Sequence, residues 1–169
     1  PTQPISPYAV SKLAAEHYCR VFYEIYGLPT VSLRYFTVYG PRMRPDLAIY
    51  IFTEKMLKNE PINIYGDGTQ TRDFTYIDNI IDCNIKLIDS DKADGKVLNI
   101  GEGKRTNINE IVDYLKEIID SSSEIRYVEA QKGDAKHTDL AKKLIGYEPK
   151  IDISEGLRKF VLWFKEFVT

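Results

Sequence analysis

The sequence predicts an α/β protein in which short strands alternate with amphipathic helices along the chain. Apolar residues recur at helical spacing in several long stretches. Between these stretches stand short runs rich in β-branched and aromatic residues, bounded by Gly and Pro. Of the 169 residues, 43% are hydrophobic and 28% are charged, which is enough apolar material for a globular core.

The first helix is expected to begin at Ser6 and Pro7 and to end at Gly27. A serine hydroxyl can cap the first turn, and proline at the first helical position has no N–H to satisfy. Glycine adopts the left-handed conformation that commonly ends a helix. A strand-like run at 30–36 follows, and the Gly and Pro content of 39–46 predicts a loop.

The second helix is expected to start from a cap at Asp46 and to run to about Asn59, before a proline. Residues 62–65, "INIY", read as a short strand, and 66–69, "GDGT", read as a tight turn. The run 71–77, "TRDFTYI", is expected to be extended.

The second half of the chain repeats the alternation of helix and strand. A third helix is indicated by an apolar stripe of Ile77, Ile81, Ile85 and Ile88. A short buried strand is expected at 96–100, and Asn107 with Glu110 forms a plausible capping pair for the next helix. Another strand is expected at 124–129, and Ser154 is expected to cap the last helix.

The composition argues against several classes of function. A net charge of −2 does not favour nucleic acid or an anionic membrane as a partner. No apolar run approaches the roughly 18 residues of a membrane span. Cys19 and Cys83 lie far apart and form no disulfide framework, which favours a reducing, cytoplasmic setting. His17 and Cys19 stand two apart on a helix and face different ways, so no metal site is expected.

Tyr8 and Lys12 are the first candidates for chemistry. They stand four residues apart in the predicted first helix, so they share one face, one turn apart. A nearby ammonium stabilises a phenolate, and such a pair can act as an acid/base on a sugar hydroxyl. The chain contains twelve tyrosines, so this spacing also arises by chance, and the pair alone is more simply interpreted as two exposed helix residues.

The surroundings of that pair carry a family resemblance. The run "SPYAVSKLAAEHYCRVFYEIYGLPTVSLRYFTVYGPRMRPD" resembles extended short-chain dehydrogenase/reductases, specifically NAD-dependent nucleotide-sugar epimerases and dehydratases. The likeness continues, in the family's order, through "IYGDGTQTRDFTYIDNI", "VLNIGEGK", "QKGD" and "LIGYEPKIDISEGL". It implies the end of a Rossmann domain over 1–40 and a small α/β substrate domain over 41–169, with segments near 77–100 returning to the Rossmann sheet.

The resemblance also implies a dinucleotide-binding half ahead of this chain. No glycine-rich G-x-x-G-x-x-G turn follows any strand in the sequence, and the family's upstream Ser/Thr is missing as well. We therefore expect the C-terminal part of a longer enzyme, and we expect the 169 residues alone to be inactive.

The site residues follow from the resemblance, motif by motif. Tyr8 would take the proton of the sugar 4-hydroxyl, while Lys12 would bond the nicotinamide ribose and stabilise the phenolate. The residues implied on the NAD side are Tyr8, Lys12, Tyr35, Phe36 and Val38. Those implied on the substrate side are Thr37, Arg44, Tyr65, Arg72 and Gln131, with Arg72 meeting the diphosphate and Tyr65 in the nucleobase pocket.

The expected function is a UDP-sugar 4-epimerase with tightly bound NAD, and the expected assembly is a homodimer. Thr37, followed by "VYGP" and "RPD", is more similar to UDP-glucuronate 4-epimerases, with UDP-glucose as the other substrate considered. A dehydratase or decarboxylase on the same scaffold, or a non-catalytic NAD- or sugar-nucleotide-binding relative, remains open. The segment 131–147 is shorter than the family pattern, which leaves its substrate loop undefined.

Overall fold

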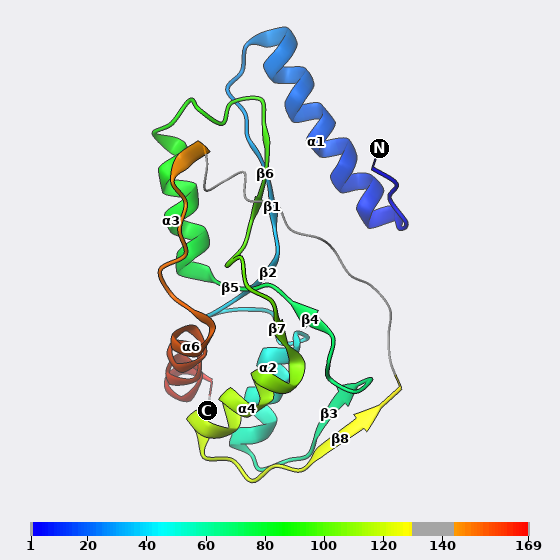
Figure 1. Cartoon of the computed structure of the whole chain (residues 1–169), viewed down its shortest axis with the longest axis vertical. Coiled ribbons are helices and arrows are strands. Elements are labelled where there is room, and N and C mark those ends of the chain that lie inside the picture. Colours follow the sequence, from blue (N-terminus) through cyan, green and yellow to red (C-terminus); the bar gives the residue numbers. More distant parts are fainter. Residues whose placement is uncertain (1, 130–143, 169) are drawn as a thin grey trace.

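A computed structural model describes residues 2–129 and 144–168 (Figure 1). Helices and strands alternate, so the predicted α/β class is confirmed. The helices are α1 (Pro7–Tyr26), α2 (Ala48–Leu57), α3 (Ile77–Ile88), α4 (Ile108–Ile119) and α6 (Ile153–Phe167). The strands are β1 (Ser32–Tyr35), β2 (Thr37–Tyr39), β3 (Ile62–Tyr65), β4 (Thr71–Arg72), β5 (Phe74–Tyr76), β6 (Val97–Ile100), β7 (Thr106–Asn107) and β8 (Ile125–Val128).

The strands pair across long stretches of sequence. Strand β1 runs parallel to β6, β2 to β5, and β3 to β8, whereas β4 and β7 are antiparallel. Parallel pairing needs a crossover connection, and the intervening helices supply it. In Figure 1, α1 and α3 lie on opposite sides of the β1–β6 pair, while α2, α4 and α6 gather at the other end of the molecule.

Helix α1 begins and ends as the sequence predicts. The backbone N–H of Ala9 donates to Ser6 Oγ at 3.1 Å, and Pro7 occupies the first helical position. Gly27 ends the helix with a φ of 65°, and its N–H donates to the carbonyl of Tyr23 at 3.1 Å. The predicted capping box at Asn107 and Glu110 is also confirmed at the start of α4.

Two predicted caps are wrong. Helix α2 starts from Leu47 rather than Asp46, and the Asp46 carboxylate instead pairs with Arg44 at 3.2 Å. Helix α6 starts from Asp152, whose Oδ1 accepts the N–H of Glu155 at 2.9 Å, so Ser154 lies inside the helix. Asp152 has the extended backbone that a capping residue needs, and its carboxylate favours the positive end of the helix.

Helix α3 forms as predicted, but it buries a different face. Three of the four isoleucines of the predicted stripe are exposed: Ile81, Ile85 and Ile88. The buried residues of α3 are Asn79, Ile80 and Cys83. A buried polar side chain is tolerated when it is hydrogen-bonded, and Asn79 meets this condition through the backbone of the segment before α6.

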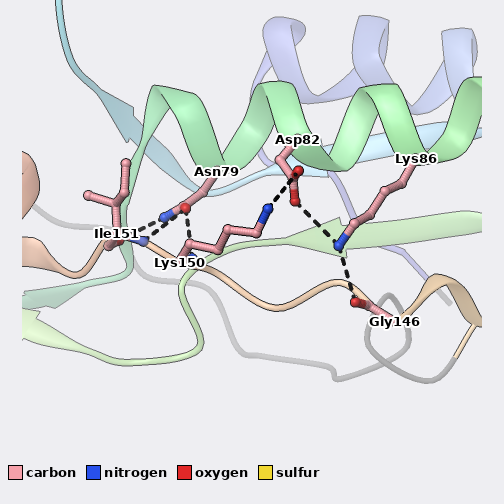
Figure 2. Close-up of polar contacts among 6 residues, drawn as sticks. All are labelled: Asn79, Asp82, Lys86, Gly146, Lys150 and Ile151. Atoms are coloured by element: carbon pink, nitrogen blue, oxygen red, sulfur yellow. Dashed lines mark hydrogen bonds and ion pairs between the residues drawn. The ribbon is translucent and has the colours of Figure 1, made fainter.

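The contacts of Asn79 attach that segment to α3 (Figure 2). Its Oδ1 accepts the N–H groups of Lys150 and Ile151 at 2.9 and 3.1 Å, and its Nδ2 donates to the Ile151 carbonyl at 2.7 Å. One turn on, Asp82 pairs with both Lys150 and Lys86. Two consecutive residues entering α6 are thus held by one side chain of α3.

Buried apolar residues form two clusters. The larger includes Phe52, Ile111, Leu157 and Phe160 and lies among α2, α4 and α6. The smaller joins α3 to β6 through Ile80, Cys83, Ala93, Leu98, Ile100 and Tyr147. The division into 1–40 and 41–169 stays a prediction. The predicted return of 77–100 to the Rossmann sheet also stays a prediction, although β6 within this range pairs with β1.

Helix α1 is attached to the β1–β6 region by a few polar contacts. Arg34 makes two bonds to the Glu16 carboxylate, at 2.7 and 2.8 Å, and Thr30 Oγ1 donates to the Cys19 carbonyl at 2.9 Å. Within the described residues, α1 has no buried side chain. Among all the residues that the structure describes, no helix has both the length and the apolar composition of a membrane span.

Candidate functional site

Tyr8 and Lys12 lie on one face of α1, as their spacing predicts. The Lys12 ammonium stands over the Tyr8 ring, with Nζ 5.5 Å from the ring centroid. Tyr8 is 71% exposed, so its hydroxyl is accessible to a ligand. A cation over an aromatic face is attracted by the ring quadrupole. The predicted spacing thus brings an ammonium and an accessible phenol together on one face of α1.

Tyr35 and Phe36 follow one another at the carboxyl end of β1. The Tyr35 hydroxyl contacts Asn84 Oδ1 of α3 at 3.0 Å, and the Phe36 N–H donates to the Ile100 carbonyl at 3.1 Å. These contacts fix the end of β1 against α3 and against the end of β6. Ligands of open α/β sheets bind outside the carboxyl ends of the parallel strands, where these two residues lie.

Thr37 and Val38 begin strand β2, which pairs with β5. Thr37 lies opposite Phe74, and Val38 lies opposite Thr75. The backbone N–H of Thr37 also donates to the Asp73 carbonyl at 3.0 Å. Thr37 and Arg72 are both predicted on the substrate side. Because Asp73 directly follows Arg72, this bond places Thr37 next to the segment that carries Arg72.

The side chain of Asp73 joins further segments at the same place. Asp73 is only 4% exposed. Its Oδ1 accepts the hydroxyl of Thr75 and the N–H of Glu102, both at 2.8 Å. Its Oδ2 accepts the N–H of Gly103 at 2.9 Å. Hydrogen bonds from N–H groups to a buried carboxylate are among the stronger protein hydrogen bonds.

Gly101 allows this close approach. A Cβ at this position would meet the Phe36 ring at 2.5 Å and Asp73 Oδ2 at 2.6 Å. Both distances are far shorter than van der Waals contact, so only glycine fits between the ring and the carboxylate. The end of β6 therefore packs directly against both groups.

Glu102 lies beside the Asp73 carboxylate, and its own carboxyl group is a weaker acid than usual. Burial, together with the nearby Asp73 charge, raises the pKa of Glu102 to about 7. A hydrogen bond from the backbone of Ile153, at the start of α6, acts in the opposite direction. Burial also raises the pKa of Tyr39 well above its usual range, and the protonated Tyr39 hydroxyl donates to the Ile153 carbonyl at 3.3 Å.

The remaining predicted residues are placed as follows. Arg72 is partly buried in β4, and its Nη1 donates to the Thr71 carbonyl at 3.0 Å. Tyr65 is 57% exposed at the end of β3, with its carbonyl accepting from Gln70 at 2.7 Å. The Arg44 side chain is 74% exposed and pairs with Asp46. Gln131 lies outside the described residues.

Sequence reasoning assigned no role to Asp73, Asn79 or Glu102. A signal for Asp73 was present, because an Asp two residues before a Thr forms a local side-chain hydrogen bond. The long-range partners of Asp73 and Asn79 gave no such signal. Among the described residues, no three His, Cys, Asp or Glu side chains are arranged to hold a metal ion.

Comparison with known proteins decides the family. A model described as the NAD dependent epimerase/dehydratase family matches residues 1–101, which is more than half of the chain. The chain belongs to this family. The motifs that carry the resemblance in the sequence are thus those of an NAD dependent epimerase/dehydratase.

Named relatives within this epimerase/dehydratase family include 4-epimerases. A UDP-glucuronate 4-epimerase of Thermodesulfobacterium geofontis is 43% identical, over 96% of this chain and 51% of the relative. A crystal structure of UDP-glucose 4-epimerase with UDP-glucose, from Thermotoga maritima, superposes with a TM-score of 0.91 at 38% identity. That match covers 99% of this chain and 56% of the Thermotoga chain.

A third match is the UDP-glucuronic acid 4-epimerase of Bacillus cereus, in complex with UDP-glucuronic acid and NAD. It is 38% identical, with a TM-score of 0.89 over 98% of this chain and 55% of that one. The chain therefore spans about half the length of the relatives that it matches.

Proposed function

We propose that the whole protein is an NAD-dependent 4-epimerase of UDP-sugars, with Tyr8 as its acid/base. The observation that carries this proposal is the Lys12 ammonium 5.5 Å from the centre of the Tyr8 ring, in an epimerase/dehydratase chain. Similarity to 4-epimerases solved with UDP-sugars supports the same reading.

The described residues fit part of an NAD site. Tyr35, Phe36 and Val38 stand at the ends of β1 and the start of β2, on the edge where open sheets bind ligands. Tyr8 and Lys12 would face the nicotinamide ribose, with the Lys12 ammonium as hydrogen-bond donor. Bound NAD supplies the acceptor and donor of the hydride at the sugar C4. Exposed Tyr8 fits this role because its oxygen is accessible to a ligand.

In this mechanism Tyr8 moves the proton and the other residues orient the sugar nucleotide. The Tyr8 oxygen, held as a phenolate by the Lys12 ammonium, would take the proton of the 4-hydroxyl as C4 is oxidised to a ketone. Tyr8 would give the proton back to this oxygen when the ketone is reduced from its other face, which yields the 4-epimer. Arg72 would hold the diphosphate through its guanidinium. Tyr65, exposed at the end of β3, would contact the nucleobase, and Thr37 would face the sugar.

We propose UDP-glucuronate as the substrate. The Thr37 hydroxyl can donate to a carboxylate at C5, and Arg44 can supply the opposite charge. Arg44 now pairs with Asp46 at 3.2 Å, but both side chains are well exposed, at 74% and 67%. Exposed ion pairs contribute only about 0–1 kcal/mol, so Arg44 can exchange partners at little cost. Gln131 stays a proposed substrate contact by resemblance alone.

The test is turnover of purified whole protein with UDP-glucuronate and with UDP-glucose, followed by nuclear magnetic resonance of the products. We expect UDP-galacturonate to form, with a higher kcat/KM for UDP-glucuronate than for UDP-glucose. Loss of CO₂ or formation of a 6-deoxy sugar would instead identify a decarboxylase or dehydratase. Equal kcat/KM for the two sugars, or an unchanged ratio in Arg44→Ala, would refute the carboxylate argument.

We also propose a homodimer that forms through α1. Large apolar side chains of this helix are exposed in the described part of the chain, among them Tyr18, Phe22 and Ile25 at 68%, 45% and 67%. Light scattering of the whole protein at micromolar concentration tests this. The cytoplasm is the compartment that we propose, because both Cys19 and Cys83 are free thiols.

A further inference from the structure

Three separate segments of the chain, two of which carry candidate residues of the site, meet around Asp73. Phe36 lies between β1 and β2, Thr37 begins β2, Arg72 lies in β4, and Gly101 follows β6. Substrate positioning is sensitive to small displacements, since a shift of about 1 Å can cost about 100-fold in rate. Some group must therefore hold the three segments in register.

One residue makes direct contacts to all three segments. Asp73 follows Arg72 in the chain, its carbonyl accepts the Thr37 N–H at 3.0 Å, and its carboxylate accepts the N–H groups of Glu102 and Gly103. Because Gly101 has no side chain, the Asp73 carboxylate and the Phe36 ring both lie close to its backbone.

We propose that Asp73 is a positioning residue, which holds the NAD-side residue Phe36 and the substrate-side residues Thr37 and Arg72 in one rigid frame. This inference rests on the proposed function, because the roles of those three residues come from it. Asp73 itself is 4% exposed and acts through its neighbours rather than on the sugar nucleotide.

The chemistry of the frame requires a carboxylate. Thr75, Glu102 and Gly103 all direct hydrogen-bond donors at the two oxygens of Asp73. A carboxylate has acceptors only and satisfies all of them, whereas an amide carries two donors of its own. In Asp73→Asn, the amide nitrogen would face a donor on one side, so the segments would separate at this point.

The chain provides a matched control in the turn after β3. Asp67 Oδ1 accepts the hydroxyl of Thr69 at 2.6 Å, and Asp73 Oδ1 accepts that of Thr75 at 2.8 Å, with the same two-residue spacing. The Asp67 side chain is exposed, and it accepts hydrogen bonds from Thr69 within its own turn. Asp67→Asn therefore makes the same chemical change outside the frame.

The experiment compares Asp73→Asn with Asp67→Asn in the whole protein, well below the melting temperature of each. Steady-state kinetics with the UDP-sugar gives kcat and KM per folded molecule, and calorimetry gives the Kd for UDP and for uridine. For Asp73→Asn we expect kcat to fall about 10- to 100-fold. We also expect weaker binding of UDP, with uridine unchanged, because Arg72 is displaced. Asp67→Asn should match the wild type.

A graded pair of variants covers the case in which Asp73→Asn does not fold. Thr75→Ala removes one donor to the carboxylate, and Thr75→Ser keeps it. We expect Thr75→Ala to lower kcat several-fold and Thr75→Ser to restore it.

A role for Asp73 in stability alone would lower the melting temperature and leave kcat, KM and the UDP affinity of the folded protein unchanged, which would overturn the proposal. An unchanged kcat in Thr75→Ala would overturn it as well. If the wild type neither binds UDP nor turns over a UDP-sugar, the proposed function fails and the role of Asp73 falls with it. A wild type that is active beside an equally active Asp73→Asn refutes only the role of Asp73.

Discussion

Helices α1 and α6 start in similar ways but contribute very differently to the molecule. The Ala9 N–H donates to Ser6 at the start of α1 at 3.1 Å, and the Glu155 N–H donates to Asp152 at the start of α6 at 2.9 Å. Within the described residues α1 buries no side chain, whereas α6 buries Gly156, Leu157, Phe160, Val161 and Phe164. Local signals thus form both helices, and only tertiary contacts decide which of them stabilises the fold.

The comparison indicates that one helix serves activity and the other serves stability. Helix α1 carries the proposed acid/base pair on an exposed face and contributes little to the core. Helix α6 packs on α4 and closes the larger cluster of buried residues, and it carries none of the proposed catalytic residues. Substitutions in α1 should therefore change activity more than stability, and substitutions in α6 should do the reverse.

The largest expected effect is on activity, from Tyr8→Phe in the whole protein. The ring remains beneath Lys12, but the group that exchanges the proton is gone. We expect kcat to fall by roughly two to four orders of magnitude, as for removal of a general acid/base. UDP binding and the melting temperature should stay near the wild-type values, measured by calorimetry. Near-normal turnover would show that Tyr8 is not the acid/base and that α1 does not carry the catalytic group.

The next largest effect is on stability, from Phe160→Ala in α6. Phe160 is fully buried, and a buried Phe→Ala change lowers the free energy of unfolding by about 3–5 kcal/mol. The matched variant in α1 is Phe22→Ala, where the residue is 45% exposed and its ring centroid lies 5.3 Å from that of Tyr26. There we expect less than about 1 kcal/mol in the 169-residue chain, by urea denaturation. Equal losses of unfolding free energy in the two variants would show that α1 and α6 contribute equally to stability.

A smaller effect concerns the pH dependence of stability at the start of α6. The pKa of Glu102 is raised from 4.5 to about 7, so between these values the folded state holds a proton that the unfolded state has lost. Stability contributed by this group is then present below pH 4.5 and is lost as the pH rises to 7. Because Glu102 is only partly buried, we expect the loss to be roughly 1–2 kcal/mol.

The variant Glu102→Gln tests this directly. It cannot lose a proton, so its free energy of unfolding should vary less between pH 5 and pH 8 than that of the wild type. Above pH 7 it should be the more stable of the two, since the repulsion with Asp73 and Asp152 is absent. A control at exposed Glu117, changed to Gln, should keep the wild-type pH dependence. The same slope in Glu102→Gln and wild type would contradict the assignment.

Sequence reasoning succeeded where the information is local. The ends of α1 and the capping box of α4 depend on residues within one turn, and both predictions are confirmed. The failures concern competing caps and long-range contacts. Asp46 can form either a cap or an ion pair, and it takes the ion pair with Arg44. Nothing near Asn79 indicates that it binds the backbone of residues some 70 positions away.

The site shows the same limit. Family motifs named Tyr8, Lys12, Thr37 and Arg72 as candidates, since each motif is a short run of neighbours. Asp73 was not assigned a role, because its partners at 102 and 103 lie 29 and 30 residues away and donate through their backbones. Backbone N–H groups are the same in every non-proline residue, so no sequence pattern reveals where they point.

The smallest predicted effect separates the two helices by their caps. Asp152→Ala removes the acceptor for the Glu155 N–H, and loss of such a cap costs typically about 1 kcal/mol. Because α6 is part of the core, the loss should appear in full in the global free energy of unfolding. Ser6→Ala removes the equivalent bond to Ala9, but fraying of an unburied helix is a local event that does not require global unfolding. We therefore expect a smaller change for Ser6→Ala in the 169-residue chain, below about 0.5 kcal/mol. Ser154→Ala serves as the control within α6, since Ser154 lies inside the helix and should be nearly neutral. Urea denaturation of the three variants measures all of these changes. A full loss in Ser6→Ala would mean that α1 unfolds together with the core, and the two helices would then share one cooperative unit.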